Sequence, residues 1–397
     1  MRQLDVHNAF LNGRVSEEIY MRQPPGYANP NCLDYVCKLQ RLLYGLKQAP
    51  RAWFTRLHDF LVQIGFCPSK TNVSLFIYDS GTARVYILVY VDDILLMGND
   101  SAMLKKLSTV FHICDLRKLR FFLGIEATEM ADSIVLSQKR YMTELLRKAA
   151  MESCKPLATH IALNTQLTPG ESDTLDDLTP YRQLVGSLMY LLITRPDLAY
   201  SVNKLCQFMH TPTQSHWAAL KRVLRYVKGS LDLGLHLAPT ATPVIHTLSN
   251  SNWVGCSIDT RSTGGYVVFL GPNLLSWVSR KQRTVARSST EAEYKALADV
   301  AAEVTWIQSL LRELWLLPST IPLLWCDNLG ATYLCSTPRR SMLKWTITLS
   351  ETKSQVVPSR LTLSPPTTSW HISSPSRCPA VRFNDLRHKL GIVPCPR

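Results

Sequence analysis

Short apolar runs and longer helical patterns alternate along this chain. Residues 87–89 and 94–97 are apolar, and the sequence Tyr-Val-Asp-Asp at residues 90–93 lies near the junction between the two runs. Short apolar runs bounded by turn residues are typical of buried strands, so the region predicts a β-hairpin with Asp92 and Asp93 at its tip. A short strand is also predicted at residues 4–6, where Asp5 lies between two apolar residues.

Other segments repeat apolar residues at helical spacing. A basic loop leads into a predicted helix that ends at Gly65, and a later helix begins at two overlapping capping boxes, Ser288 with Glu291 and Thr290 with Glu293. The remaining predicted elements are helices over 101–113 and 181–229, a strand over 120–125, and a hairpin of 266–270 with 274–278. One face of 216–228 is basic, which fits either solvent or a nucleic-acid backbone.

Composition narrows the possible classes of protein. The formal net charge of +14 suits a polyanionic partner, although the residues from Arg339 onward carry +8 of it. The eleven cysteines are scattered and form no Cys-x-x-Cys pair, which favours a reducing compartment over disulfides or a zinc ribbon. No signal peptide and no membrane-spanning apolar run is recognised, so we expect an intracellular, soluble protein without a membrane partner.

The aspartates suggest metal chemistry. Paired carboxylates inside an apolar hairpin are costly to bury unless a cation neutralises them. If Asp5 lies on a neighbouring strand, it completes with Asp92 and Asp93 a carboxylate set for two-metal nucleotidyl transfer. The alternative for Asp92 and Asp93 alone is an ordinary acidic turn.

Two further features fit a nucleotide site and also have simpler explanations. Phe10 follows Asp5 by five positions, where an aromatic ring can pack under the sugar of a nucleotide; alternatively, it is a core residue. Lys47 and Arg51 lie at the entry of a helix and can meet triphosphate oxygens, or they form a solvated basic cap.

Taken together, the motifs resemble the reverse transcriptase and ribonuclease H (RNase H) region of copia-type (pseudoviral) retrotransposon polyproteins. The resemblance runs from residue 2 to about residue 338, with the motifs in the family's order. It rests on residues 3–13, 43–53, 90–93, 122–125, 194–197, 261–266, 288–294 and 327–328.

The resemblance implies an α/β (α+β) fold and RNA-directed DNA polymerase activity. The expected fold is a palm with an antiparallel sheet, then a helical connection, then an RNase H-like domain. The implied cofactor is Mg²⁺ (or Mn²⁺), and the implied partners are an RNA template, a DNA primer, an RNA–DNA hybrid and dNTP. A cytoplasmic retrotransposon particle or the nucleus is the implied location.

Residue by residue, the resemblance also assigns roles. Catalytic roles fall on Asp5, Asp92, Asp93, Glu291 and Asp327, and the first three are the implied metal ligands. The implied nucleotide-binding residues are Phe10, Lys47, Gln48 and Arg51, and the implied primer contacts are Phe122, Leu123 and Gly124.

The chain also departs from the family pattern. The basic fingers segment that precedes the first catalytic strand in the family is missing here, so we expect a truncated palm in which that strand is an edge strand. Asn250 stands where the family has the first acid of its RNase H site. We therefore expect an inactive copy, and the alternative function is a non-catalytic nucleic-acid-binding remnant of a transposon pseudogene.

The expected domain boundaries follow from these motifs. We expect a palm and thumb over residues 1–150, a helical connection over 151–234, an RNase H-like domain over 235–338, and a disordered tail over 339–397. Half of residues 341–380 are Ser, Thr or Pro, without an amphipathic period. Because a two-base shift can turn parts of this stretch into family-like strings, we interpret it as partly out of frame; otherwise it is a disordered extension.

Overall fold

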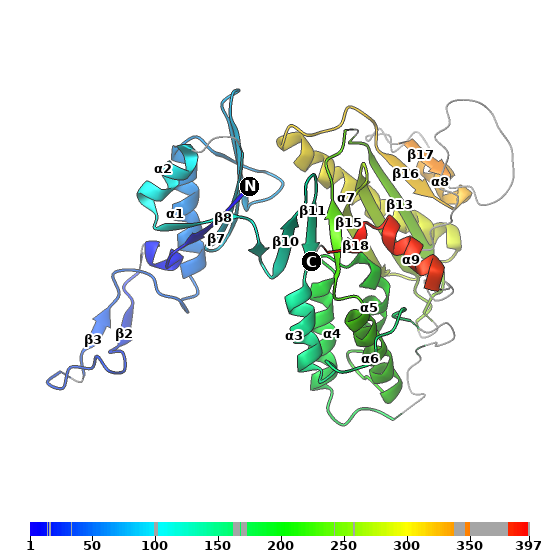
Figure 1. The fold of residues 1–397 in the computed structure, drawn as a ribbon, viewed down its shortest axis with the longest axis horizontal. Helices are drawn as coiled ribbons and strands as arrows, with labels where there is room; N and C mark the ends of the chain where they lie inside the picture. Colours follow the sequence, from blue (N-terminus) through cyan, green and yellow to red (C-terminus); the bar gives the residue numbers. More distant parts are fainter. Residues whose placement is uncertain are drawn as a thin grey trace. The chain divides into compact units, whose positions relative to one another are not determined.

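The structure is a computed structural model in which the chain forms two units (Figure 1). It describes residues 1–397 except 14, 16, 33, 99–101, 162–166, 168–172, 242, 257–258, 337–345, 350–379 and 396–397. Unit 1 comprises Met1–Phe122 with Ser309–Trp315, and unit 2 comprises Leu123–Gln308 with Leu316–Arg397. Within the described residues, no helix combines the length and the apolar character needed to cross a bilayer.

Unit 1 is built on a six-stranded sheet with the strand order β4-β5-β6-β7-β1-β8. The strands are β1 (Arg2–Val6), β4 (Cys67–Pro68), β5 (Leu75–Asp79), β6 (Arg84–Tyr90), β7 (Asp93–Gly98) and β8 (Ile113–Lys118). β1 pairs antiparallel with β7 on one side and with β8 on the other. The expectation that this first strand is an edge strand is therefore wrong, because β8 supplies its second hydrogen-bonding partner.

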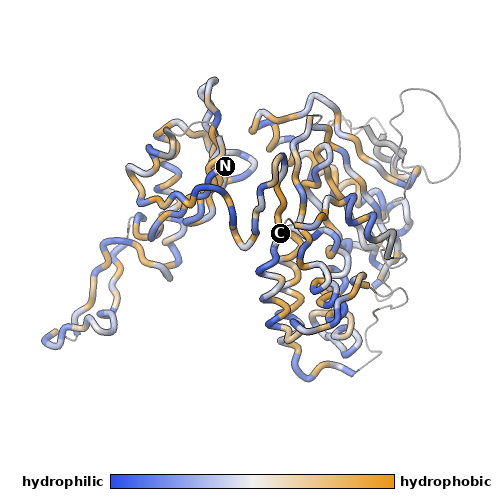
Figure 2. Tube along the Cα trace, in the orientation of Figure 1, coloured by the Kyte–Doolittle hydropathy of each residue, from blue (hydrophilic) through white to orange (hydrophobic). Residues whose placement is uncertain are grey.

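Two helices cover one face of this sheet. They are α1 (Ala49–Gln63) and α2 (Ala102–Val110), and the single turn η1 (Ala9–Asn12) follows β1. Trp53, Leu57 and Leu61 of α1 are almost fully buried and share one apolar core with Leu4 and Val6 of β1. The helical spacing in the sequence therefore identified the buried face of α1 correctly, and Figure 2 shows the apolar residues of α1 along the trace.

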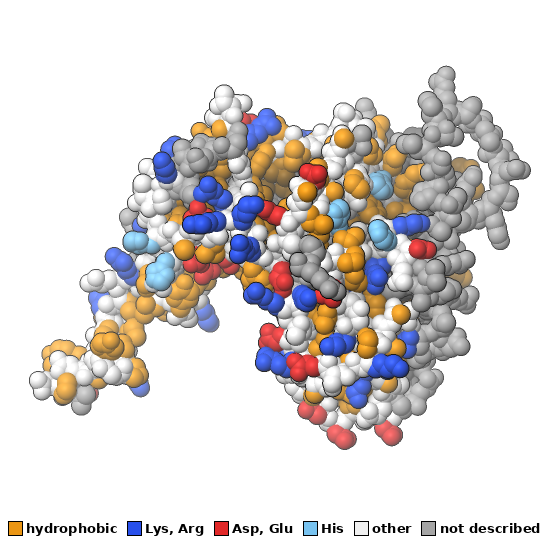
Figure 3. Space-filling model, in the orientation of Figure 1, with side chains coloured by type: hydrophobic (Ala, Val, Ile, Leu, Met, Phe, Trp, Pro, Cys, Tyr) orange, Lys and Arg blue, Asp and Glu red, His pale blue; other side chains and the backbone are white. Residues whose placement is uncertain are grey.

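A separate two-stranded arm, β2 (Tyr20–Arg22) paired with β3 (Val36–Lys38), carries apolar side chains on its surface. Figure 3 shows hydrophobic side chains gathered over this arm, and Tyr27 and Tyr35 are 85% and 72% exposed.

Unit 2 contains a helical layer. Its elements are α3 (Lys139–Lys148), α4 (Thr179–Leu191), η2 (Pro196–Leu198), α5 (Ala199–Cys206) and α6 (Gln214–Gly229). The four α-helices share one apolar core. Beside this core, Arg195 is fully buried and makes two hydrogen bonds to Asp197, at 2.7 and 2.9 Å. The Tyr226 hydroxyl donates to the same carboxylate at 2.6 Å, so the buried charge is well satisfied.

The second part of unit 2 is a mixed five-stranded sheet, β15-β14-β13-β16-β17. Its elements are β13 (Ile245–Asn252), β14 (Thr263–Leu270), β15 (Asn273–Lys281), α7 (Ser289–Glu313), β16 (Leu323–Cys326), α8 (Leu329–Ser336) and β17 (Thr346–Leu349). The first three strands are antiparallel, whereas β13 pairs parallel with β16, and β16 with β17. The predicted 266–270 and 274–278 hairpin corresponds to β14 and β15.

The predicted strand over residues 120–125 is interrupted. The structure has β9 (Phe121–Phe122) and β10 (Ile125–Glu129), separated by Leu123 and Gly124 with φ angles of 47° and 74°. Two consecutive residues with positive φ form a turn, which an apolar sequence pattern does not reveal. β10 continues into a sheet with β11 (Ile134–Ser137), β12 (Leu233–Leu237) and β18 (Ile392–Pro394).

Ordered elements lie within the tail that we expected to be disordered. Besides β17 and β18, the helix α9 (Ala380–Lys389) falls within residues 339–397. Open edges explain the two strands, because β16 and β12 each offer a free row of backbone groups on which another strand can pair. This corrects the expectation for these elements; most of residues 341–380, and with them the out-of-frame interpretation, lie outside the described residues.

We predict that acid destabilises the protein through His160. This side chain is 97% buried beside the Tyr226 ring, with 3% exposed. Burial lowers the pKa of His160 from 6.5 to about 4, partly opposed by the negative charge of Asp197. The unfolded chain binds this proton at a higher pH than the folded chain does. The free energy of unfolding therefore keeps its full value above about pH 6.5. It should fall by roughly 3 kcal/mol as the pH falls to about 4.

Urea unfolding between pH 7 and pH 4 measures this effect. His160→Gln should flatten the pH dependence, whereas His7→Gln, at an exposed position, should leave it unchanged. An equal slope in the wild type and in His160→Gln would contradict the assignment.

Candidate functional site

The hairpin of β6 and β7 has a strained two-residue turn, Val91 and Asp92. Tyr90 pairs with Asp93 across the turn, and Val91 has a φ angle of 55°. Such a φ angle is unusual for a β-branched residue and requires support from the surrounding structure. Two hydrogen bonds provide it: the Trp53 indole Nε1–H donates to the Val91 carbonyl at 2.7 Å, and the Val6 N–H donates to the Asp92 carbonyl at 2.9 Å.

This turn lies beside the strand that carries Asp5. In the pairing of β1 with β7, Asp5 is directly opposite Asp93, as expected for a neighbouring strand. Burial raises the pKa of Asp93, a hydrogen bond from Gln3 lowers it in part, and the charges of Asp92 and Asp5 raise it further. Asp93 thus lies close enough to Asp5 and Asp92 for their negative charges to act on it.

The three carboxylates lie farther apart than we expected from the sequence. Among the described residues, the only group of three possible ligand side chains whose atoms all lie within 4.8 Å of one another is elsewhere, at Glu293, Cys326 and Asp327. Oxygen is nevertheless the ligand type that Mg²⁺ prefers, so the chemistry of Asp5, Asp92 and Asp93 fits this ion.

Phe10 and Tyr44 form an aromatic pair beside these aspartates. Their ring centroids are 4.4 Å apart; Phe10 is buried, whereas Tyr44 is half-exposed. Burial of the hydroxyl raises the pKa of Tyr44, as do the charges of Asp92 and Asp5, while the backbone near Ala9 lowers it in part. Sequence reasoning did not single out Tyr44, although it stands one position before Gly45 in the basic loop.

The other nucleotide-binding candidates lie where α1 begins. Gln48 is the N-cap residue of α1, and Lys47, Gln48 and Arg51 are all exposed to solvent. They are therefore free to reach an anion in front of the helix, where backbone N–H groups add to the attraction. Of the primer-contact candidates, Phe122 ends β9, and Leu123 and Gly124 form the turn described above.

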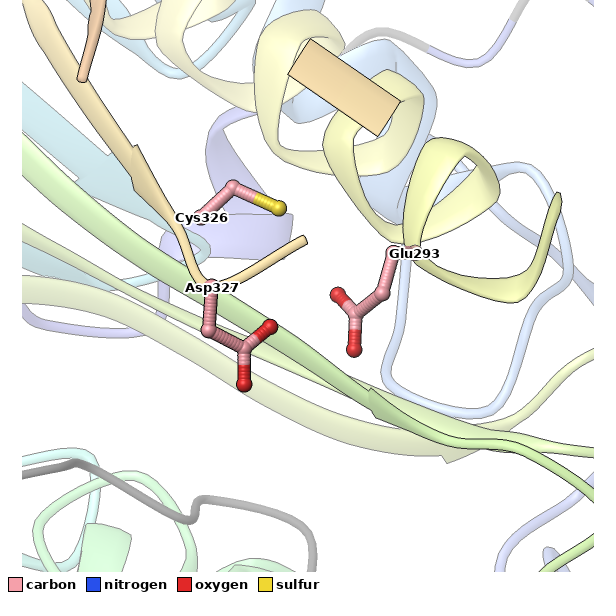
Figure 4. Close-up of side chains that lie close together, drawn as sticks. All are labelled: Glu293, Cys326 and Asp327. Atoms are coloured by element: carbon pink, nitrogen blue, oxygen red, sulfur yellow. The ribbon is translucent and has the colours of Figure 1, made fainter. Parts of the chain in front are cut away.

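A second acidic group lies in the mixed sheet of unit 2 (Figure 4). Glu293 comes from the start of α7, and Cys326 and Asp327 come from the end of β16. Asn250 of β13 lies beside them, and its Nδ2 donates to Asp327 Oδ2 at 3.1 Å. Burial raises the pKa of Glu293 to about 8; a hydrogen bond from the Ser251 N–H lowers it in part, and the charge of Asp327 raises it.

The structure does not bring Glu291 to this group. Glu291 is partly exposed and accepts hydrogen bonds from Lys295 and from the Arg287 N–H, at the outer side of the first turn. The sequence did contain a signal for Glu293, which precedes Leu297, Val300 and Val304 by four, seven and eleven positions. That spacing places Glu293 on the buried face of the helix, but its position in a capping box led us to treat it as a cap.

The two-Mg²⁺ arrangement of an RNase H site does not fit this second group. Asn250 is a neutral amide where the resemblance in sequence implies an acid, and its N–H donor points at Asp327. Cys326 adds a sulfur ligand, which Mg²⁺ disfavours.

Comparison with known proteins identifies relatives of the chain. The family model described as "Reverse transcriptase (RNA-dependent DNA polymerase)" matches residues 1–163. The chain is 49% identical over 342 residues to the retrovirus-related Pol polyprotein from transposon RE2 of Arabidopsis thaliana, covering 85% of this chain and 24% of that protein. It is 32% identical over 308 residues to the putative transposon Ty5-1 protein of Saccharomyces cerevisiae, covering 76% of this chain and 100% of that protein.

Two further proteins are similar to this chain. The chain is 33% identical over 345 residues to the Pol polyprotein from transposon TNT 1-94 of Nicotiana tabacum, covering 83% of this chain and 26% of that protein. It thus spans about a quarter of the plant polyproteins that it matches. A solved foamy viral protease-reverse transcriptase in complex with dsDNA covers 89% of this chain and 68% of that protein, with a TM-score of 0.42 and 14% identity.

We predict that Trp53→Phe loosens the hairpin tip. The variant removes the indole N–H and leaves the Val91 carbonyl without its donor, which should lower the free energy of unfolding by about 1–3 kcal/mol. It should also weaken Mn²⁺ binding by the aspartates, measured by isothermal titration calorimetry.

Phe111→Leu is the matched control, because the Phe111 ring packs edge-on against Trp53 at 5.2 Å and belongs to the same core. This control should lose stability and keep its Mn²⁺ affinity. Equal Mn²⁺ affinity in the wild type and in Trp53→Phe would refute the role of this hydrogen bond.

Proposed function

Because the chain belongs to the family of copia-type retrotransposon Pol polyproteins, we propose that unit 1 carries the nucleotidyl-transfer site of an RNA-directed DNA polymerase. One observation supports this most strongly. Asp5 lies opposite Asp93 on paired strands, with Asp92 in the adjoining strained turn. A carboxylate held beside two others, one of them in a strained turn, is costly for stability and suits a cation-binding function.

In this proposal, Asp5, Asp92 and Asp93 hold Mg²⁺, or Mn²⁺ in its place. The bound metal supplies activation of the primer 3′-hydroxyl and neutralisation of charge on the triphosphate. Gln3 donates a hydrogen bond to Asp93 and keeps that carboxylate oriented and ionised beside its two neighbours.

The residues around the aspartates bind and orient the nucleotide. The half-exposed ring of Tyr44, backed by the buried core ring of Phe10, forms an aromatic surface on which a dNTP sugar packs. Lys47 and Arg51 attract the triphosphate, and Gln48 adds a polar contact at the beginning of α1. Phe122, Leu123 and Gly124 contact a DNA primer paired with an RNA template.

Unit 2 supplies an RNase H-like fold in this proposal, with an RNA–DNA hybrid as the nucleic-acid partner. Glu293 and Asp327 lie together beside the mixed sheet. Asn250, which donates to Asp327, stands where the resemblance implies the first acid of the RNase H site. We propose that this site does not hydrolyse RNA.

The second candidate function is a non-catalytic nucleic-acid-binding protein derived from a transposon. The observation that favours it is Asn250, a substitution at the centre of a site whose chemistry depends on carboxylates. The two candidates differ in whether unit 1 transfers nucleotides.

Primer extension on an RNA template distinguishes them. With Mg²⁺ or Mn²⁺ and dNTPs, the polymerase proposal predicts extension that Asp92→Asn reduces by at least about 100-fold, as is typical when transition-state charge stabilisation is removed. Asp79→Asn, in the same sheet and away from the turn, is the matched control and should retain activity. Primer binding without extension by the wild type would favour the non-catalytic candidate.

Hydrolysis of an RNA–DNA hybrid tests unit 2 separately. We predict no cleavage by the wild type above the level of Asp327→Asn, because a neutral amide at residue 250 cannot supply the charge that two metal ions need. Asn250→Asp alone should not restore cleavage, since the fourth carboxylate that the resemblance implies is also absent. Cleavage by the wild type that disappears in Asp327→Asn would overturn this prediction.

A further inference from the structure

The turn at Leu123 and Gly124 is held by a side chain from the helical layer of unit 2. The Tyr190 hydroxyl of α4 donates a hydrogen bond to the Leu123 carbonyl. Leu123 has a φ angle of 47°, which is unfavourable for a residue with a side chain and requires support from its surroundings. Tyr190 supplies this support, although it lies 67 residues further along the chain.

Gly124 fits closely against the same hydroxyl. Its φ angle of 74° lies in the left-handed region that favours glycine. A Cβ atom at this position would lie 2.8 Å from the Tyr190 hydroxyl oxygen and 3.3 Å from a ring carbon of Tyr190. Because glycine has no Cβ atom, the turn can approach Tyr190 closely enough for the hydrogen bond to Leu123. Both residues of the turn are therefore matched to one tyrosine.

Buried polar groups hold Tyr190 in place. The Gln138 Nε2–H donates to the Tyr190 carbonyl at 3.2 Å, and the Thr194 hydroxyl donates to Gln138 Oε1 at 2.8 Å. Gln138 and Thr194 are fully buried, so these two hydrogen bonds are shielded from water. The Tyr141 ring packs edge-on against the Tyr190 ring, with centroids 4.9 Å apart. Thr194 begins the Thr-Arg-Pro-Asp stretch of the sequence, and this support gives that residue a structural role.

We propose that Tyr190 is the positioning residue of the turn at Leu123 and Gly124, which we call the primer-contact turn. The inference rests on the proposed function, in which Phe122, Leu123 and Gly124 contact a DNA primer. Leu123 and Gly124 are only partly buried, so a nucleic acid can reach them. Tyr190 acts through the turn, because fixing one conformation before binding reduces the entropy cost of binding.

The affinity of the full chain for a DNA primer annealed to an RNA template tests this proposal. Fluorescence anisotropy in the absence of dNTP measures this binding separately from nucleotide transfer. Tyr190→Phe removes only the hydroxyl that donates to Leu123. Its affinity for the primer–template should be about two- to tenfold lower than that of the wild type, which is the effect of losing one hydrogen bond.

Tyr181→Phe is the matched control. The Tyr181 hydroxyl belongs to the same helix, and it donates to the Leu205 carbonyl of α5 at 2.9 Å instead of to the turn. This variant should lose stability in thermal unfolding and keep the wild-type affinity for the primer–template. The comparison separates the positioning of the turn from a general contribution to the helical layer.

Gly124→Ala tests the same contact from the other side and keeps the test available if Tyr190→Phe does not fold. The added methyl group meets the Tyr190 hydroxyl, so the affinity for the primer–template should fall. The double variant Tyr190→Phe/Gly124→Ala should lose less affinity than the two single losses combined, because both changes act on one contact.

Equal affinities of the wild type and Tyr190→Phe would overturn the proposal. So would an equal loss of affinity in Tyr181→Phe, fully additive losses in the double variant, or a wild type that does not bind the primer–template. A wild type that binds the primer–template without extending the primer contradicts the polymerase function alone. Weaker binding by Tyr190→Phe would then still support the positioning role of Tyr190.

Discussion

The hydrogen bond from Trp53 to the Val91 carbonyl is the contact on which the candidate polymerase site depends. A left-handed conformation at a β-branched residue costs roughly 1–2 kcal/mol, so Val91 adopts it only because other contacts fix the turn. Trp53 is buried in the core between α1 and the sheet, and its indole reaches the turn from there. Two sequence motifs that lie 38 residues apart therefore act as one physical unit.

Strand β1 contributes the other half of this arrangement. Its side chains alternate, so Leu4 and Val6 face the apolar core whereas Gln3 and Asp5 face the opposite side. The same alternation brings Gln3 and Asp5 to the side of Asp93, where Gln3 donates a hydrogen bond. Because β1 lies between β7 and β8, both of its edges are paired and its register is fixed. An interior strand is a more rigid support for a catalytic carboxylate than an edge strand.

Local signals in the sequence predicted some elements well. The apolar spacing of Trp53, Leu57 and Leu61 identified α1 and its buried face, and the apolar runs around Asp92 identified the hairpin. These predictions succeeded because each of these elements buries apolar residues whose spacing along the local sequence reveals the element. The turn at Leu123 and Gly124 was missed because its positive φ angles leave no trace in the apolar pattern.

Non-local pairing explains the other differences. β17 and β18 form on the open edges of β16 and β12. The local sequence of a strand does not indicate which edge of a distant strand is open. The choice between Glu291 and Glu293 depends on which side of α7 faces the sheet. Helical spacing contained that answer, whereas the capping pattern at the same residues pointed to a different role.

The two acidic groups of the chain illustrate how surroundings decide the chemistry of a carboxylate. Asp5, Asp92 and Asp93 are partly exposed and offer only oxygen, with Asp93 beside the charges of the other two, so they would suit a hydrated ion such as Mg²⁺. Glu293 is buried, shares its space with a thiol and an amide, and has an oxygen atom without a hydrogen-bond partner. Asn250 adds an amide donor beside Asp327 where the resemblance implies a carboxylate, so this group has one negative charge fewer than a two-metal site needs.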